Sequence, residues 1–586
     1  MAVKAKGIAA LIFPLIFFFI IFLALVSECD SCGGSSSITP SDYPKISKDE
    51  ALKRLENLVR SINPRDENVQ SRKMLQIKEA DLADTLPDIS VIDKHYPLTV
   101  DVPNPASNDL VLEIFCSTEK SGKKAPDDWF TRVVTEFNRK RLTTSKGKVV
   151  QIKLRYIDSG TGHFYIRAGK YLPDAFSPSN HLWLAMIKAA GIKITPIAER
   201  LAGNTAGVVM KKETYEKLKA TYGSVDIKAI IDAVAQGSIA MGYTNPYASS
   251  TGLNFLVTVL ATYAGGDQTR FLAPEVISSF EAFQKGVPFV ALTTIQMRES
   301  VQKGGALDAF VLEYQTFLQE SSLAQEYQFI PFGVRHDNPL YVIGDQDNEK
   351  IEALKALARY AEANIGLANE YKFNADNSYQ SAFAIPDGKV LIEALKLWKE
   401  KKDAGRPVAA VFVADVSGSM EGYPLKNLKI ALKEGANFIG VQNSIGLVKY
   451  STNVTRLLPI ATFNALQQSR YLAAIASLEA EEDTAMFDGI LVGLKMLVDY
   501  IKTNQDYKPM LFVLTDGNTN AGICQSFRDL ASIIDALDIP VYTIAYGEDL
   551  NTNLLKALAL INEAAYLDAK DEAIINKISS LLNAEM

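Results

Sequence analysis

The chain has 586 residues, too many for a single hydrophobic core, which predicts two or three domains. Its hydrophobic fraction of 48% and charged fraction of 22% are ordinary for a globular protein. The net charge is −7, and the lysines and arginines are spread along the chain, which argues against a nucleic-acid-binding protein.

The N-terminus carries an uncharged apolar run from Ile8 to Val26 that is long enough to span a bilayer. Lys4 and Lys6 precede it, and the positive-inside rule places them in the cytoplasm and the bulk of the chain outside. We therefore expect a signal anchor and a single-pass membrane protein of a bacterium. A cleaved signal peptide and a lipoprotein signal that ends at Cys29 remain as alternatives, although Glu28 stands where a lipoprotein signal expects a small residue.

Residues 29–108 are predicted to be a linker and an irregular stalk, since they are polar with scattered prolines. One helix is expected inside this stretch, from Lys48 to Asn63, where the apolar residues have amphipathic spacing. Ser47 is its expected cap, and Glu50 completes the pattern of a capping box.

Strands and helices alternate in residues 109–400, and the ends of the strands are rich in Ser, Thr and Gly. Helix N-termini offer free N–H groups and a positive dipole end, which suit an anion. Hydroxyl groups would add hydrogen-bond donors there, although any single one of them is also explained as a helix cap. The candidate ligand-binding residues are Ser117, Ser159, Thr161, Ser177, Ser249 and Thr251.

Two short motifs occur in this region, Leu172 to Ser179 (LPDAFSPS) and Thr244 to Gly252 (TNPYASSTG), and each is less specific than a longer pattern would be. With the order of elements around them, they resemble bacterial extracellular solute-binding proteins of the type II periplasmic class, and among these the oxyanion binders. The resemblance implies two α/β lobes that close on a small anionic solute. A fold of this kind is also compatible with a protein-interaction scaffold.

A buried parallel strand is predicted from Val408 to Ala414, and it opens into Asp415-Val416-Ser417-Gly418-Ser419. A second buried strand, Leu511 to Leu514, ends in Thr515-Asp516. Open α/β sheets place their sites at the carboxyl ends of such strands. Carboxylate and hydroxyl oxygens are hard ligands of low total charge, and they suit Mg²⁺.

The remaining elements of residues 405–586 alternate in the same way, so the fold class is α/β with a doubly wound parallel sheet. The expected helices are Leu425 to Ile439, Ala485 to Ile501, Leu554 to Ile561 and Ile574 to Leu582. The further expected strands are Gly446 to Tyr450 and Val541 to Ala545.

This domain resembles the von Willebrand factor A (VWA) domain, a Rossmann-like fold with a metal-ion-dependent adhesion site (MIDAS). In that family the site binds a divalent cation and leaves one coordination position open, which a carboxylate of a partner usually fills. The resemblance implies Mg²⁺ (or Mn²⁺ or Ca²⁺) and a protein partner with an acidic side chain. Asp483 stands where the family usually has Gly, and a domain that keeps the fold without metal is the alternative. The implied metal ligands are Asp415, Ser417, Ser419, Thr484 and Asp516.

The expected organisation is a membrane segment (1–28), a linker and stalk (29–108), a solute-binding-like domain (109–400) and a VWA domain (405–586). We expect a membrane-anchored extracytoplasmic binding or adhesion protein, in which the solute-binding-like domain senses a ligand or serves as a scaffold. The alternative is a transport-linked receptor for an oxyanion-like solute with an accessory VWA domain. No set of nucleophile, base and orienting group, and no phosphate-binding glycine motif, is evident, so we expect no enzyme activity.

Overall fold

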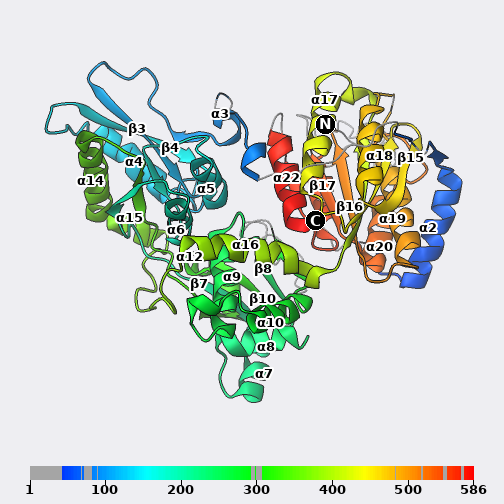
Figure 1. The fold of residues 1–586 in the computed structure, drawn as a ribbon, viewed down its shortest axis with the longest axis horizontal. Coiled ribbons are helices and arrows are strands. Elements are labelled where there is room, and N and C mark those ends of the chain that lie inside the picture. Colours follow the sequence, from blue (N-terminus) through cyan, green and yellow to red (C-terminus); the bar gives the residue numbers. More distant parts are fainter. Residues whose placement is uncertain are drawn as a thin grey trace, which may run out of the picture. The chain divides into compact units, whose positions relative to one another are not determined.

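The computed structural model describes residues 43–67, 69–71, 82–88, 90, 92–291, 297, 307–481, 483–516, 519–545, 551–568 and 573–586 (Figure 1). All of them belong to one compact unit, Pro40–Met586. The predicted membrane segment and Cys29 lie outside the described residues. Within the described part of the chain, no helix has both the length and the apolar character needed to cross a bilayer.

The first lobe of the predicted solute-binding-like domain contains a six-stranded sheet with the order β2-β4-β3-β5-β12-β6. Strands β3, β4 and β5 run parallel to one another, and β2, β6 and β12 add antiparallel pairs. The bounds are β2 Leu98–Val100, β3 Asp109–Cys116, β4 Val149–Tyr156, β5 Ala175–Ser177, β6 Ile194–Ala198 and β12 Leu340–Ile343.

The second lobe contains a five-stranded sheet with the order β11-β7-β10-β8-β9. The chain enters this lobe after β6 and returns to the first lobe through β12, so two segments connect the lobes. Two connections of this kind are typical of hinged, two-lobed binding proteins. The bounds are β7 Ala206–Lys211, β8 Met241–Thr244, β9 Phe289–Ala291, β10 Ala309–Glu313 and β11 Tyr327–Pro331.

Helices cover both sheets (Figure 1). Helix α16 packs against α6 of the first lobe and against α9 and α10 of the second lobe. The bounds are α3 Ile92–His95, α4 Trp129–Arg139, α5 Ser159–Arg167, α6 Leu182–Ala189, α7 Lys212–Tyr222, α8 Ile227–Ala235, α9 Ser250–Tyr263, α10 Pro274–Lys285, α12 Tyr314–Gln319, α13 Ser321–Glu326, α14 Asn348–Ala363, α15 Ile365–Glu370 and α16 Gly388–Lys401.

The C-terminal domain is built on a seven-stranded sheet with the order β1-β15-β14-β13-β16-β17-β18. The prediction of a parallel sheet is confirmed for β13, β14, β16, β17 and β18, whereas β15 runs antiparallel to β14. The connection from Tyr450 to Val454 is too short for a crossover, so β15 has to run back along its neighbour. The bounds are β13 Val408–Asp415, β14 Ser444–Tyr450, β15 Val454–Thr462, β16 Lys508–Thr515, β17 Val541–Ala545 and β18 Tyr566–Asp568.

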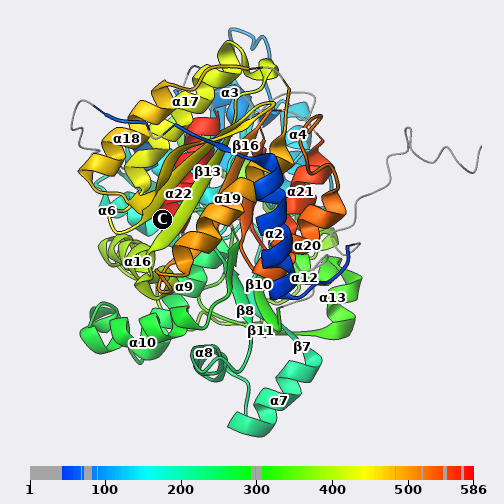
Figure 2. The ribbon, with the colours of Figure 1, turned by 90° about the vertical axis from the view of Figure 1, so that its right-hand side faces the viewer.

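Helices lie on both faces of this sheet (Figure 2). One face buries Phe412 and Phe512 under α17 and α22, because side chains alternate between the two faces of a strand. On the other face, Gly489 and Gly493 let α19 approach Val411 and Val413 closely. The bounds are α17 Tyr423–Gly435, α18 Ala465–Ala476, α19 Met486–Ile501, α20 Phe527–Leu537, α21 Thr552–Leu560 and α22 Ala573–Glu585.

The N-terminal helix α2 (Lys48–Ile62) begins as predicted, with the Ser47 hydroxyl accepting a hydrogen bond from the Glu50 main-chain N–H at 3.2 Å. The Glu50 carboxylate does not complete a capping box but accepts a bond from Arg54 at 2.5 Å. Helix α2, whose buried residues include Leu55, packs on α19 and α20 of the C-terminal domain (Figure 2).

Strand β1 (Arg65–Asp66) follows α2 and pairs with β15, the outer strand of the C-terminal sheet. Arg456 of β15 binds Asp66 with 2.7 Å between Nε and Oδ1. The structure thus differs from the expectation of an irregular stalk. Pairing with β1 covers the exposed edge of β15, and packing of α2 buries its apolar face, and both changes stabilise the fold. The two-lobed domain is therefore inserted between two pieces of the chain that pack together.

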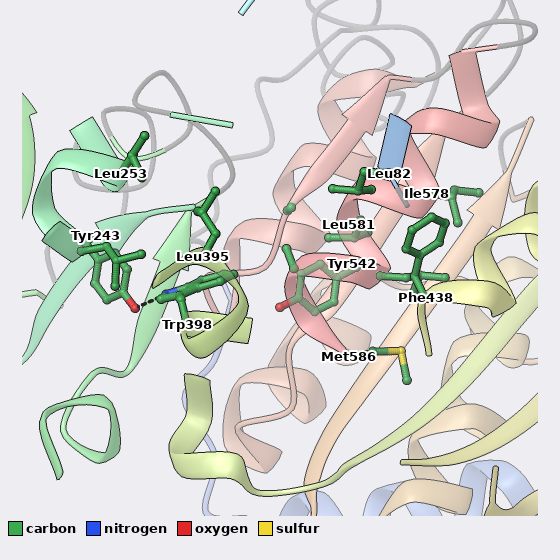
Figure 3. Packing of buried hydrophobic residues seen from close by; sticks show 14 of the residues in the cluster. Leu82, Tyr243, Leu253, Leu395, Trp398, Phe438, Tyr542, Ile578, Leu581 and Met586 are labelled. Atoms are coloured by element: carbon green, nitrogen blue, oxygen red, sulfur yellow. Dashed lines mark hydrogen bonds between the residues drawn. The ribbon is translucent and has the colours of Figure 1, made fainter. Parts of the chain in front are cut away.

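Helix α16 and the start of β13 connect the two-lobed domain to the C-terminal domain, and a continuous hydrophobic cluster surrounds this joint (Figure 3). Trp398 of α16 donates its indole N–H to the Tyr243 hydroxyl of β8 at 2.7 Å. Just beyond α16, Lys402 forms a buried ion pair with Glu585 at 3.0 Å.

Candidate metal site at the edge of the C-terminal sheet

Asp415, the last residue of β13, is fully buried and held by three hydrogen bonds. Its Oδ1 accepts the main-chain N–H of Ser417 at 2.9 Å. Its Oδ2 accepts the hydroxyls of Tyr450, at 3.1 Å, and Thr515, at 2.9 Å. Tyr450 and Thr515 end the two strands that flank β13, so the sheet register fixes the orientation of this carboxylate.

A chain of hydroxyl groups connects this carboxylate loop to Asp516, the residue after β16. The Ser417 and Ser419 hydroxyl oxygens are 3.1 Å apart, and the Ser419 hydroxyl donates to Asp516 Oδ1 at 3.1 Å. Ser417 is buried and Ser419 is exposed, so the chain leads from the interior toward solvent. The structure therefore brings together four of the five predicted metal ligands.

Thr484, the fifth predicted ligand, reaches the same edge through its main chain. Its N–H donates to the Asn520 side chain at 2.8 Å, and its carbonyl accepts the N–H of Asn520 at 3.0 Å. The next N–H, of Ala485, donates to the carbonyl of Ser451 at 2.8 Å, directly after β14. Among the described residues, no hydrogen bond joins the Thr484 hydroxyl to the other four ligands.

Asp483 has a left-handed backbone with φ of 43°. Glycine adopts this conformation without strain, and Asp is among the few other residues that tolerate it. The departure from the family pattern is thus explained by backbone geometry. The Asp483 carboxylate accepts a hydrogen bond from the Thr452 hydroxyl at 3.4 Å.

Asp488, in the first turn of α19, positions the loop after β16 and was not predicted as a site residue. Its two carboxylate oxygens accept the N–H groups of Ile523, at 2.7 Å, and Cys524, at 2.9 Å. Gly522 has φ of 111°, and a Cβ there would lie 2.8 Å from Asp488 Oδ2. The sequence could have indicated this role, because an acidic residue stands four positions after Thr484, in the first turn of a predicted helix.

The electrostatics of the site fit a cation. Burial, together with the nearby Asp415 carboxylate, raises the pKa of Asp516 to about 6. Burial also raises the pKa of Asp415, against the hydrogen bonds of Ser417, Thr515 and Tyr450, which lower it. A divalent cation between the two carboxylates would reverse both shifts.

The donor set also fits a cation, because it consists of two carboxylates and three hydroxyls, which are the hard oxygen ligands that Mg²⁺ prefers. Across the described residues, no group of three or more His, Cys, Asp or Glu side chains forms an alternative metal cluster. The residues present therefore suit a magnesium-like ion in which water completes the coordination shell.

The cleft between the lobes contains a small cavity of about 40 Å³. Three predicted ligand residues, Ser159, Ser249 and Thr251, line it. Ser117 is not among the lining residues, but its hydroxyl donates to the lining residue Glu119 at 2.5 Å. The structure does not bring Thr161 or Ser177 into the lining.

The charge of this cavity is acidic, since Glu119, Asp158 and Glu313 also line it. The buried Lys120 ammonium bonds to Asn338 at 3.0 Å and to Glu119 at 3.3 Å. Burial opposes ionisation of Glu119, but the Lys120 charge and the hydroxyls of Ser117 and Ser179 lower its pKa overall. Glu313 Oε1 is hydrogen-bonded to His336 Nδ1 at 2.9 Å. This surrounding does not favour the predicted anion.

Comparison with known proteins confirms the resemblance of the C-terminal domain. Residues 410–580 match the family model described as the von Willebrand factor type A domain. Inter-alpha-trypsin inhibitor heavy chain H3 of Mesocricetus auratus is 29% identical over 164 residues, which are 27% of this chain and 18% of that protein. An uncharacterised protein of Synechocystis sp. is 28% identical over 184 residues, 29% of this chain and 40% of that protein. The chain thus spans less than half the length of these relatives, and residues 410–580 form a VWA domain.

Solved structures similar to the two parts of the chain have low TM-scores. A von Willebrand factor type A protein from Catenulispora acidiphila has a TM-score of 0.28 at 18% identity and covers 30% of this chain and 42% of that one. A periplasmic thiamin binding protein has a TM-score of 0.35 at 12% identity and covers 52% of this chain and 99% of that one. The sulfate-binding protein of Mycobacterium tuberculosis H37Rv has a TM-score of 0.32 at 15% identity, with 46% and 88% coverage. At these TM-scores the likeness carries no functional weight.

Proposed function

We propose that this protein is a membrane-anchored, extracytoplasmic binding or adhesion protein that captures an acidic side chain of a protein partner through a divalent cation. The cation is held by Asp415, Ser417, Ser419, Thr484 and Asp516. The observation that carries the proposal is the hydrogen-bonded chain from Asp415 through Ser417 and Ser419 to Asp516.

The geometry supports capture rather than catalysis. A bound Mg²⁺ would offer an electrophilic position to an incoming carboxylate. The chain itself fixes one carboxylate with three donors and leaves Ser419, at the end of the hydroxyl chain, exposed to solvent.

A peptide selection tests the capture of a carboxylate. Random peptides displayed on phage are selected on residues 40–586 in Mg²⁺ and eluted with EDTA. We expect the eluted peptides to share an Asp or Glu, and to lose binding when that residue becomes Asn or Gln. Asp415→Ala should lose these peptides, whereas Asp506→Asn, an exposed charge before β16 at the opposite end of that strand, should keep them. Peptides without a shared acid would contradict the proposal.

The two-lobed domain supports a second role, as a receptor for a small solute. The cavity between the lobes is lined by hydroxyls and by three acidic residues. Glu119 is paired with Lys120, so Asp158 and Glu313 are the groups that favour a cationic or hydroxylated solute over an oxyanion. A thermal-shift panel of organic cations, polyols and oxyanions tests this. Stabilisation by a cation that is lost in Glu313→Gln supports the role, and stabilisation by oxyanions alone restores the anion expectation.

A further inference from the structure

A second and larger cavity, of about 680 Å³, lies where α5 and α16 of the two-lobed domain meet the VWA domain. This volume is in the range of sites for drug-sized molecules. It shares no lining residue with the cavity between the lobes or with the metal ligands. The part of the chain that lines it includes the segment Asn437 to Gln442, directly after α17.

Two buried polar side chains at this cavity lack partners. His163 of α5 is 1% exposed, and neither of its ring nitrogens has a hydrogen-bond partner among the described residues. Burial lowers the pKa of His163 well below its usual value, so the ring is neutral, with one N–H donor and one acceptor nitrogen. The Asn583 side-chain amide, 6% exposed, also has an unpaired Nδ2 while its oxygen accepts from Lys399 at 2.7 Å. Such groups are costly unless something bonds to them.

The walls of the cavity are apolar and partly flat. The rings of Phe164 and Tyr247 are stacked, with centroids 6.4 Å apart and an interplanar angle of 10°. Leu395 of α16 lines one side, and Phe438 and Met586 of the VWA domain line the other (Figure 3). A planar apolar group fits walls of this kind.

The charged groups at the cavity are mainly cationic. Arg167 lies over the Phe164 ring at 5.4 Å, and Lys396 and Lys399 stand on α16, where Lys396 also pairs with Glu393 at 2.8 Å. Glu400 is the acidic residue among those that line the cavity. Three cationic groups against one acidic group favour a ligand with a negative charge.

We propose that this cavity binds a small amphipathic organic anion, with a flat apolar body packed between the Phe164–Tyr247 pair on one side and Phe438 on the other, and with a carboxylate directed at the His163 imidazole and the cationic side chains. Such a ligand would contact the two-lobed domain and the VWA domain at once, so it would stabilise the joint between them. This role is independent of the metal site.

The test uses naphthoate, with naphthylmethanol and naphthylmethylamine as neutral and cationic compounds of the same ring. Each is titrated calorimetrically into residues 40–586, the compact unit of the chain. We expect saturable binding of naphthoate that is at least about tenfold tighter than that of the cationic compound. Equal binding of all three compounds, or no saturable binding of naphthoate, would overturn the proposal.

Variants locate the site. Val441 is 64% exposed and lines the cavity, so Val441→Trp should obstruct it and weaken naphthoate binding at least about tenfold, with the fold intact. His163→Phe should weaken binding about fivefold without lowering the melting temperature, because it removes unpaired polar atoms. Lys396→Gln should weaken binding about fivefold, and Lys389→Gln, an exposed charge on α16 outside the lining, should not. An unchanged affinity in Val441→Trp would place the ligand elsewhere.

Discussion

The edge of the VWA sheet and the cleft between the lobes place the same residue types at similar positions. In both, Ser, Thr and acidic residues follow the ends of strands. At the VWA edge, the described partners of Asp415 and Asp516 are hydroxyl and main-chain donors. In the cleft, the buried Lys120 already accompanies Glu119.

This difference decides what each site requires. Two carboxylates that share a buried edge without a charged partner are stabilised when a cation binds between them. The raised pKa of Asp516 shows that its ionised form is disfavoured while no cation is present. A carboxylate that has its own lysine is satisfied within the chain. The hydroxyls of the cleft are also occupied, as when the Ser249 side chain caps α9. Residue type at a strand end is therefore a weaker guide than the partners of that residue.

Among the changes that test this difference, replacing Lys120 with Met should have the largest effect on the free energy of unfolding. The Glu119 side chain, which is 17% exposed, would lose its cation. Loss of one partner of a buried pair costs about 3–5 kcal/mol, and this partly exposed carboxylate should lie near the lower end of that range. Chemical denaturation should show this loss in the free energy of unfolding. The double variant Lys120→Met/Glu119→Gln should regain most of the lost unfolding free energy. If Lys120→Met alone is as stable as the wild type, the ion pair of Lys120 and Glu119 does not stabilise the cleft.

Metal removal is the corresponding change at the VWA edge. At a free Mg²⁺ concentration about a hundredfold above its dissociation constant, the ion should stabilise the folded state by about 2.7 kcal/mol. EDTA should therefore lower the melting temperature of the wild type. Asp415→Ala should melt at the same temperature with and without EDTA, and Lys120→Met should still respond to the ion.

Tyr450→Phe tests whether the orientation of the Asp415 carboxylate matters for metal binding. The variant removes a hydroxyl that bonds Asp415 Oδ2 but keeps the packing of the ring. Losing a hydrogen bond to a charged group costs about 1.5 kcal/mol, so Mg²⁺ affinity should fall about tenfold. Calorimetric titration measures this, with Tyr500→Phe as a control, since the Tyr500 hydroxyl bonds Ser444 at the other end of β14. Equal affinity in Tyr450→Phe and wild type would show that the other donors suffice.

Asp483→Gly should have the smallest effect. Glycine accepts the left-handed conformation at this position, but it also gives the unfolded chain more freedom. The two contributions oppose each other, so we expect a change in unfolding free energy of less than about 1 kcal/mol. A loss of several kcal/mol would indicate that the hydrogen bond from Thr452 is essential to the loop.

Four of the five predicted metal ligands could be placed from the sequence, because they lie in short patterns at the ends of two apolar strands; Thr484 precedes helix α19 instead. Asp415 ends β13 and Asp516 follows β16, which are neighbours in the sheet, and alternation of strands and helices was enough to place them at one edge. Tyr450 and Thr515 were not identified as their partners, because that requires the register of three strands.

Long-range packing explains what the sequence reasoning missed. Arg65 pairs with Thr455, and Glu56 of α2 binds Lys495 at 3.1 Å, contacts between residues about 400 positions apart. No local pattern in the segment after the apolar run indicates such a partner. The acidic character of the cleft was missed for the same reason, since Glu119 and Glu313 come from different lobes.

The most direct test of the central claim is native mass spectrometry of residues 40–586 purified in Mg²⁺. Wild type is compared with Asp415→Ala, Asp516→Ala and the control Asp506→Asn. The account predicts one divalent ion on the wild type and on the control, and none on the two site variants. A protein without the ion in all four samples, or an ion retained by Asp415→Ala, would contradict it.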